Sequence, residues 1–388
     1  SRGLGDVYKR QILIFYSSNL FGQEQFNFDV TEIEIKEKGN KFIGLKRGTI
    51  TTDNGVNIDA DNFIYDKIPN ILNAEGNVKI TDENNNTIIF SNKITYLKND
   101  EIIFTSGDSK AINDETIISA EEFNYSKETN ILVGKSKVNI TDSKEDVKIF
   151  AQEMTYNKNE EIIFTKGFTE AHVQNKYKFY SNDVFYDKEK IELSSKSKTQ
   201  VLDDKFNIYE LDEFNYSKKK FLLKGKKVKI KTNFRSLNNS DEYFFENGFF
   251  DLKNRNFNAG KTSINMQKSI FGNIENDPRL VGVKSFKENE ITQINKGVFT
   301  SCKKRDGCPP WSLQAQKIIH DKIKKQLVYD HALLKIYDVP VVYFPKFFHP
   351  DPTVKRQSGL LKPILNESQV LGSSLQSVSY THLRAHET

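Results

Sequence analysis

One pair of side chains stands out in the sequence as a candidate acid–base catalyst. His349 and Asp351 lie two residues apart, and an imidazole beside a carboxylate can move protons. Pro350 and Pro352 flank the aspartate, which favours a rigid turn over a catalytic pair. The sequence has no Gly-rich phosphate loop, no zinc-binding His-Glu pair and no nucleophile elbow. We therefore predict that the protein is not an enzyme and uses no cofactor and no metal.

The two cysteines lie close together. Cys302 and Cys308 are six residues apart with Asp306 and Gly307 between them, so they can close a small disulfide loop. A zinc site is not expected, because zinc needs four ligands and no second Cys or His pair stands at ligand spacing. A disulfide would favour an oxidising compartment.

The overall charge is mild, with 57 basic and 52 acidic residues and a net charge of +5. The segment 218–231 is rich in lysine and contains no acid, which makes it a candidate for contact with a phosphate-bearing partner. The alternative is a solvated face of a strand. Basic and aromatic residues do not interleave as on a nucleic-acid platform, so no nucleic-acid partner is expected.

The strongest pattern is a motif that recurs six times: an apolar residue, any residue, Tyr, any residue, Lys. The tyrosines are 31, 29, 31, 30 and 30 residues apart. A fixed period in this range indicates stacked repeats, in which no unit buries its apolar face alone. The six copies are Phe63-Tyr65-Lys67, Ile94-Tyr96-Lys98, Phe123-Tyr125-Lys127, Met154-Tyr156-Lys158, Val184-Tyr186-Lys188 and Phe214-Tyr216-Lys218.

Each repeat is predicted to be two short strands around a tight turn. Apolar and polar residues alternate with period two at 78–80, 138–140 and 228–230, as in a strand with one buried face. Turn-forming Asn, Asp or Glu residues follow most copies of the motif. A mean hydropathy of −0.60 suits a thin stack of strands better than a compact globule. The predicted fold is all-β: an elongated stack of hairpin repeats, each about 30 residues long.

The pattern changes towards the C-terminus. Residues 232–295 are less regular, with a decayed repeat near Phe249. Apolar spacing over 312–327 is compatible with an amphipathic helix, but the alternation at 332–336 favours strands through this region. Prolines after residue 344 then predict an extended connector.

Both ends of the chain resemble translated adapter sequence, and we exclude them from the fold. Residues 12–22 have the composition of a signal-peptide remnant, with a short buried strand as the alternative. We therefore expect the chain to be a fragment of a secreted protein. No run of 18 apolar residues occurs, so no membrane-spanning helix is predicted.

Two groups of motifs carry a resemblance to a known family. The segment 74–78 with Ile80 resembles the repeat signature of the OstA-like jellyroll shared by the lipopolysaccharide-transport proteins LptA, LptC and the N-terminal part of LptD. Motifs nearer the C-terminus are similar to the segment that joins the LptD jellyroll to its outer-membrane barrel. The residues of this connector motif are Trp311, Pro340, Tyr343, Pro345, Pro350, Asp351, Pro352, Arg356, Ser358 and Gly359.

The resemblance covers residues 23–376 and implies a domain order. An adapter-like tag and signal remnant at 1–22 would precede a periplasmic OstA-like jellyroll at 23–345. A Pro-rich connector at 346–357 would lead to the first strand of an outer-membrane barrel at 358–376, before a second tag at 377–388. The remainder of the barrel is absent from the sequence. Some members of the family link this domain to the barrel by disulfides, so each cysteine can also pair with a cysteine outside this sequence.

The family resemblance implies lipopolysaccharide transport and assembly at the outer membrane. The jellyroll would accept the lipid from a periplasmic LptA-like bridge, bound by pairing with an edge strand near Phe28, and pass it to the barrel. An LptE-like lipoprotein plug would bind through the barrel. The candidate residues of the apolar groove are Val78, Ile80, Ile94, Tyr96, Val138, Ile140, Met154 and Tyr156.

Three alternatives remain open from the residues. The groove candidates can equally form the core of a closed sandwich. The chain can be a soluble periplasmic bridge or scaffold like LptA or LptC. A secreted β-solenoid carbohydrate enzyme would need clusters of Asp, Glu or Arg in register on successive rungs, and none is seen.

Overall fold

The computed structural model describes residues 26–233, 240–266, 277–304 and 309–350, together with four short strands after residue 350. The predicted tag and signal remnant at 1–22 lie outside the described residues, as do residues 351–357 of the predicted connector.

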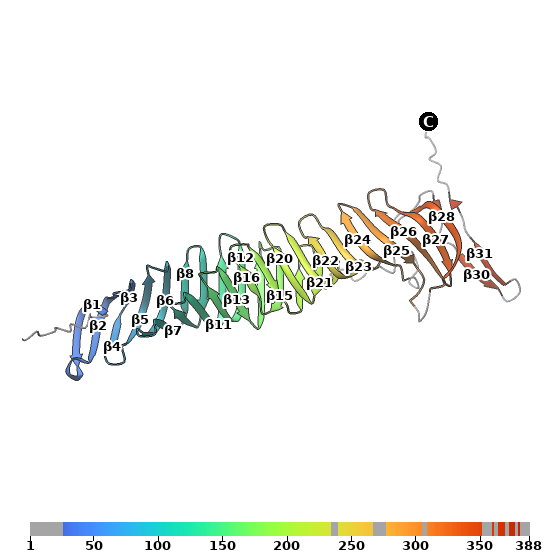
Figure 1. Ribbon diagram of the computed structural model, residues 1–388. Coiled ribbons are helices and arrows are strands. Elements are labelled where there is room, and N and C mark those ends of the chain that lie inside the picture. Colours follow the sequence, from blue (N-terminus) through green and yellow to red (C-terminus); the bar gives the residue numbers. More distant parts are fainter. Residues whose placement is uncertain are drawn as a thin grey trace, which may run out of the picture.

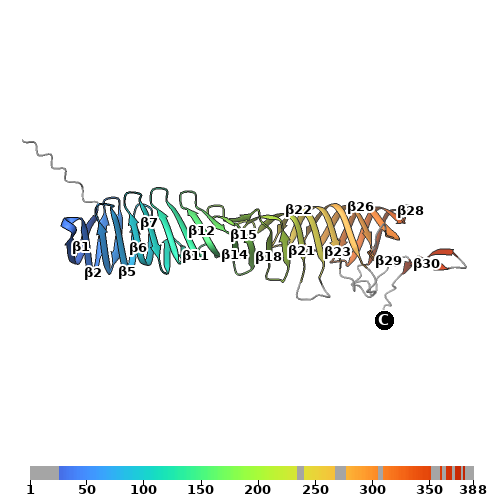
Figure 2. The same cartoon turned by 90° about the horizontal axis from the view of Figure 1, so that it is seen from below.

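The described chain is a long stack of antiparallel strands, in agreement with the predicted all-β fold. Twenty-eight strands, β1–β28, belong to one hydrogen-bonded sheet. Figure 1 shows them following chain order along one axis, from β1 at one end to β28 at the other. Figure 2 shows the same elongated shape after a quarter turn. No helix in the described part of the chain is long and apolar enough to cross a membrane.

Two layers arise because long strands bend and each half then pairs with different neighbours. In β5 (Ile71–Asp82), residues 71–75 pair with β4 (Asn62–Asp66), whereas residues 79–82 pair with β3 (Val56–Ala60). We call the layer that contains β3 layer one and the layer that contains β4 layer two.

Short strands fill each layer between the long ones. Those of layer one are β3, β8 (Ser109–Asn113), β9 (Thr116–Ala120), β14 (Phe168–Val173), β15 (Tyr177–Asn182), β18 (Thr199–Leu202) and β19 (Ile208–Leu211). Those of layer two are β4, β7 (Ile102–Ser106), β10 (Glu122–Ser126), β13 (Ile162–Lys166), β16 (Phe185–Asp187), β17 (Glu192–Ser195) and β20 (Glu213–Ser217).

Long strands build the first and last parts of the stack. In its first part they are β1 (Phe26–Lys36), β2 (Lys41–Thr52), β5, β6 (Thr87–Leu97), β11 (Ile131–Asp142) and β12 (Val147–Asn157). They continue as β21 (Leu222–Lys231), β22 (Glu242–Asp251), β23 (Asn256–Asn265), β24 (Arg279–Glu288), β25 (Ile291–Thr300), β26 (Trp311–Asp321), β27 (Gln326–Ile336) and β28 (Val339–Pro350). A 3-10 turn, η1 (Glu37–Gly39), joins β1 to β2.

The bends of the long strands coincide with β-bulges. The pairing of β5 with β6 shifts between Glu75 and Val78, where Gly76 has φ +84° and Asn77 has φ 46°. At Gly76 a Cβ atom would lie 2.6 Å from a carboxylate oxygen of Asp61, so glycine suits both the backbone and the space. We call this side of the stack, where the chain passes from layer to layer, the corner edge. The opposite side, where tight turns of both layers end, is the turn edge.

The interior is an apolar core between the layers. One buried cluster extends from Phe26 to Ala259 and a second from Ile264 to Leu334, and Tyr243 packs against both. The alternation predicted at 78–80, 138–140 and 228–230 is confirmed, because Val and Ile face this core in each segment.

The C-terminal part is more regular than its sequence suggested. From β21 to β28 each described strand pairs with the next, so the described strands within segment 232–295 continue the sheet. Residues 312–327 form β26 and the start of β27, not a helix. The last long strand runs through Pro350, so the sheet continues five residues past the predicted boundary at 345.

Four short strands follow the main sheet. They pair as β29 (Gly359–Leu360) with β32 (Ser379–Tyr380) and as β30 (Ile364–Ser368) with β31 (Gly372–Gln376). The first three fall in the segment predicted as the first barrel strand, and β32 falls in the predicted C-terminal tag.

Candidate functional site

The repeated Tyr-Lys motif lies at the turn edge of layer two. Its copies occupy β4, β6, β10, β12, β16 and β20, or the residues next to them, and each of these strands ends at this edge. The last five tyrosines are at most 1% exposed, and Tyr65 is 8% exposed. The apolar residue that opens each copy is also buried in the core. The period of about 30 residues therefore places equivalent Tyr and Lys side chains on alternate strands of one layer.

Three of these tyrosines donate hydrogen bonds across the turn edge to layer one. Tyr125 Oη lies 2.9 Å from Asp82 Oδ2 at the end of β5. Tyr186 makes the same bond to Asp142 Oδ2, at 2.7 Å, at the end of β11. Tyr156 Oη lies 3.3 Å from Asn113 Oδ1 and shares its single proton with Glu161 Oε2 of layer two, at 2.8 Å. Each of these contacts links a turn of layer two to a turn of layer one, and the described residues show no backbone hydrogen bond between these turns.

The lysines of the motif cross the same gap. Lys127 Nζ donates to the Asn54 carbonyl at 2.6 Å, and Lys218 Nζ lies 2.8 Å from Glu145 Oε2. Both partners are 73 residues earlier in the chain. The Lys98 ammonium bridges Asp53 of layer one at 3.2 Å and Glu101 of layer two at 2.6 Å.

Two further lysines complete the row. Lys158 donates to the Asn85 carbonyl and to the Thr87 hydroxyl of layer one. Lys188 remains within layer two, where it contacts Glu161 at 2.6 Å and the Tyr156 hydroxyl at 2.9 Å. We call the motif residues from Tyr96 to Lys218, with their layer-one partners, the seam.

Burial sets the electrostatics of the seam. Loss of hydration raises the pKa of Tyr96, Tyr156 and Tyr186 well above the ordinary tyrosine value, and a neighbouring carboxylate raises each further. Burial lowers the pKa of the Lys158 ammonium, and nearby carboxylates act in the opposite direction. The tyrosines are therefore neutral hydrogen-bond donors at neutral pH.

The predicted groove residues all lie in the closed core. Val78, Ile80, Ile94, Tyr96, Val138, Ile140, Met154 and Tyr156 are each at most 2% exposed. The structure brings all eight into one buried cluster. In this conformation their side chains contact one another and not solvent, as in the closed-sandwich alternative.

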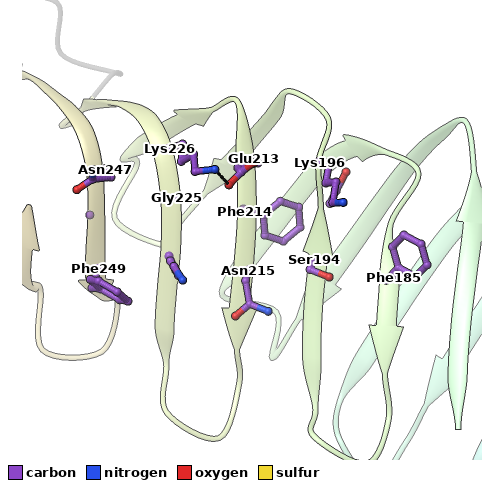
Figure 3. Close-up of a pocket in the computed structure, with 13 residues that line it drawn as sticks. Phe185, Ser194, Lys196, Glu213, Phe214, Asn215, Gly225, Lys226, Asn247 and Phe249 are labelled. Carbon is purple, nitrogen blue, oxygen red and sulfur yellow. Dashed lines mark ion pairs between the residues drawn. The ribbon is translucent and has the colours of Figure 1, made fainter. Parts of the chain in front are cut away.

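A pocket lies against layer two and borders the core at Phe214 (Figure 3). Phe185 and Phe249 line it and are each 48% exposed. Gly225 and Gly248 also line it, and a Cβ atom at either would meet the core side chain of Leu211 or Phe250. An ion pair of 2.7 Å between Lys226 and Glu213 borders the pocket.

The lysine-rich segment 218–231 is paired largely within the sheet. Lys226, Lys227 and Lys229 lie 2.7, 3.0 and 3.8 Å from acids of neighbouring segments. The Lys224 ammonium lies 5.5 Å from the centre of the Phe249 ring. These contacts are those expected of a solvated strand face.

Only some of the residues in the cysteine, histidine and connector predictions are among the described residues. Cys302 is a free, half-buried thiol, whereas Cys308 lies outside the described residues, so the disulfide stays a prediction. His349 lies in β28, where its Nε2 is 2.9 Å from the Tyr329 hydroxyl, and Asp351 is not among the described residues.

The connector motif is spread over several elements. Trp311 is buried at the start of β26, and Tyr343 lies exposed in β28, where its hydroxyl is 2.7 Å from His331 Nδ1. Pro340, Pro345 and Pro350 are also in β28, and Gly359 begins β29. Pro352, Arg356 and Ser358 lie outside the described residues.

The seam partners in layer one were missed by the sequence analysis. Asp82 and Asp142 both end an Ile-Thr-Asp triplet, and the triplets are 60 residues apart, or two repeats. This recurrence was the one sign in the sequence that the two aspartates hold equivalent positions. It did not reveal that each aspartate meets a tyrosine 43 or 44 residues later. No cluster of three or more potential metal ligands occurs among the residues that the structure describes.

Comparison with known proteins gives one consistent family of relatives. No protein-family model matches the chain. LPS-assembly protein LptD of Polaromonas sp. is 32% identical over 98 residues, which cover 24% of this chain and 12% of that protein. LptD of Hahella chejuensis is 34% identical over 79 residues, which cover 20% of this chain and 10% of the relative. LptD of Ectopseudomonas mendocina is 30% identical over 96 residues, which cover 25% of this chain and 10% of that protein.

Solved structures are also similar. One of them is LptH of Pseudomonas aeruginosa, described as the LptA homologous periplasmic component of the lipopolysaccharide transport device. The match has 12% identity and a TM-score of 0.26, and it covers 28% of this chain and 81% of LptH. A likeness this low adds nothing to the all-β architecture already described. The matched segments span only about a tenth of each curated relative. Over about a quarter of its length, this chain is similar in sequence to LPS-assembly proteins of the LptD family, as its motifs indicated.

Proposed function

We propose that this chain is the periplasmic jellyroll of a lipopolysaccharide-assembly protein and that it carries the acyl chains of the lipid between its two layers. The observation that carries this proposal is the shape of the apolar interior. It is a strip of buried Ile, Val, Phe and Tyr side chains that runs from Phe26 to Leu334. Within the described residues, the backbone joins the layers on either side only at the corner edge.

The energetics suit transport along such a strip. Each CH₂ group that leaves water gains about 0.8 kcal/mol, so an acyl chain of about a dozen carbons gains roughly 10 kcal/mol before ordering costs. Because the repeats are similar, neighbouring positions have similar affinity and a lipid can move along the strip without being trapped. The direction of movement would come from an upstream energy source outside this chain.

The proposed partners bind at the two ends of the stack. Of the strands in the described residues, β1 pairs with β2 alone, which leaves its other edge for strand addition by an LptA-like bridge. The β28 end would face an outer-membrane barrel and its lipoprotein plug. Under this proposal the jellyroll would lie in the periplasm and the complete protein in the outer membrane.

Site-specific photo-crosslinking tests the proposal. A photoreactive phenylalanine analogue at Met154, which is 0% exposed in the core, should cross-link to lipopolysaccharide. The matched control is Phe185, on the outer face of layer two and 48% exposed. Cross-linking at Phe185 but not at Met154, or at neither position, would overturn the proposal.

A further inference from the structure

The seam is the one side of the interior where the layers are held together by side chains alone. Along the corner edge the backbone of β5, β6, β11 and β12 passes from one layer to the other. Opening that edge would break continuous strands. At the turn edge, the described contacts between layers are bonds such as Tyr125 to Asp82 and Lys127 to Asn54.

We infer that the seam is a latch: it parts to admit the lipid, and its lysines then bind the phosphates of the lipid head group. This inference rests on the proposed function and adds the side of loading and the residues that recognise the head group.

The seam lysines are suited to an exchange of partners. Lys98 and Lys158 are 7% and 8% exposed, and Lys218 faces the Glu145 carboxylate at 2.8 Å. A buried ammonium that loses its partner is costly, because the charge is then uncompensated. A phosphate that arrives as the layers separate replaces each carboxylate or carbonyl with an anionic acceptor, so the ammonium stays paired throughout.

The spacing of the seam also fits a mobile head group. Successive copies of the motif lie on alternate strands, about 9 to 10 Å apart at the usual strand spacing. The row continues through Lys98, Lys127, Lys158, Lys188 and Lys218. A head group can therefore be passed from one lysine to the next while its acyl chains slide in the interior.

A reversible lock across the seam tests the inference in the full chain. Asn54 of layer one and Glu101 of layer two are in contact, with Nδ2 and Oε2 2.6 Å apart, and Glu145 faces Lys218 further along. Cysteines at both pairs, in a background with Cys302→Ser and Cys308→Ser, can be joined by short, reducible thiol cross-linkers. The matched control joins Asn70 to Asn99, whose side chains are 2.7 Å apart in two turns of layer two.

The measured quantity is the uptake rate of fluorescent lipopolysaccharide. We expect the lock to slow uptake at least about ten-fold, reduction of the linker to restore it, and the Asn70–Asn99 link to leave it unchanged. Equal uptake by locked and reduced protein would overturn the latch while leaving lipid binding intact. No uptake by the unmodified protein would instead overturn the proposed function itself.

A second measurement addresses the lysines separately. The ratio of affinities for diphosphorylated and dephosphorylated forms of the same glycolipid should fall several-fold in Lys127→Met and Lys188→Met. Lys188→Arg, which keeps the charge, should retain the preference, as should Lys67→Met, whose lysine is exposed in the first copy of the motif. An unchanged ratio in both seam variants would overturn the assignment of phosphate binding.

Discussion

Removal of a single hydroxyl group from the seam should loosen the two turns that it connects. The Tyr186 hydroxyl donates to Asp142 Oδ2 at 2.7 Å, and the carboxylate is only 4% exposed. The other carboxylate oxygen accepts from the backbone N–H of Glu145 at 3.0 Å. In Tyr186→Phe one buried oxygen therefore loses its donor while the rest of the site is unchanged.

The expected loss follows from the charge of the acceptor. A hydrogen bond to a buried charged group contributes about 1.5 to 3 kcal/mol, which corresponds to about a 10- to 150-fold change in the local opening equilibrium. Tyr216→Phe is the matched control. Tyr216 is the next tyrosine of the motif and is 0% exposed, but its hydroxyl has no partner among the described residues. Its removal should cost little or be slightly stabilising.

Amide hydrogen exchange followed by mass spectrometry measures these effects locally. Local measurement matters because long repeat arrays need not unfold in one cooperative step. Peptides that cover 140–147 and 185–191 should exchange about 10- to 150-fold faster in Tyr186→Phe. In Tyr216→Phe the exchange rate of the corresponding peptides should change by no more than about two-fold. The reasoning is refuted if both variants accelerate exchange equally, or if Tyr186→Phe does not.

Three further predictions concern the end strand and the pH dependence of stability. Val30→Pro in β1 should weaken binding of an LptA-like bridge, measured by calorimetry, and unchanged affinity would argue against docking on this edge. Gly48→Ala should destabilise the pairing of β1 with β2 by about 1 to 3 kcal/mol, because the new Cβ would lie 2.6 Å from the Asp29 carbonyl oxygen. Faster amide exchange in β1 would show this loss. The control is Gly260→Ala, whose new Cβ would meet only the Asn247 side chain, at 3.1 Å. Denaturation midpoints should fall as the pH rises above 10.0, the ordinary tyrosine value. Tyrosines with a raised pKa in the folded state contribute stability that is complete below that value and lost above it. The lowered pKa of Lys158 acts in the opposite direction, because its cost of burial is relieved as the pH approaches 10.5, but the five seam tyrosines with a raised pKa outweigh one lysine. Midpoints that rise between pH 9.5 and pH 11 would contradict this assignment.

Much of the local structure was predictable because it depends on short-range alternation. Val78 and Ile80 face the core because successive residues of a strand point to opposite sides. The 30-residue period likewise placed Tyr96, Tyr125 and Tyr156 at equivalent, buried positions of one layer. Residues 312–327 were the weaker case, because short apolar runs are ambiguous between helix and strand until their pairing partners are known.

The sequence by itself determined a stacked all-β repeat with one apolar face and a row of tyrosines and lysines at fixed intervals. Only the tertiary structure decided that the two apolar faces meet in a closed core. It also decided that the row closes one side of that core, with Lys127 held by Asn54 and Tyr186 held by Asp142. The physical reason is distance along the chain. Alternation and period act within a few residues, whereas these partners are 73 and 44 residues apart and meet only when the bent strands bring the two layers face to face.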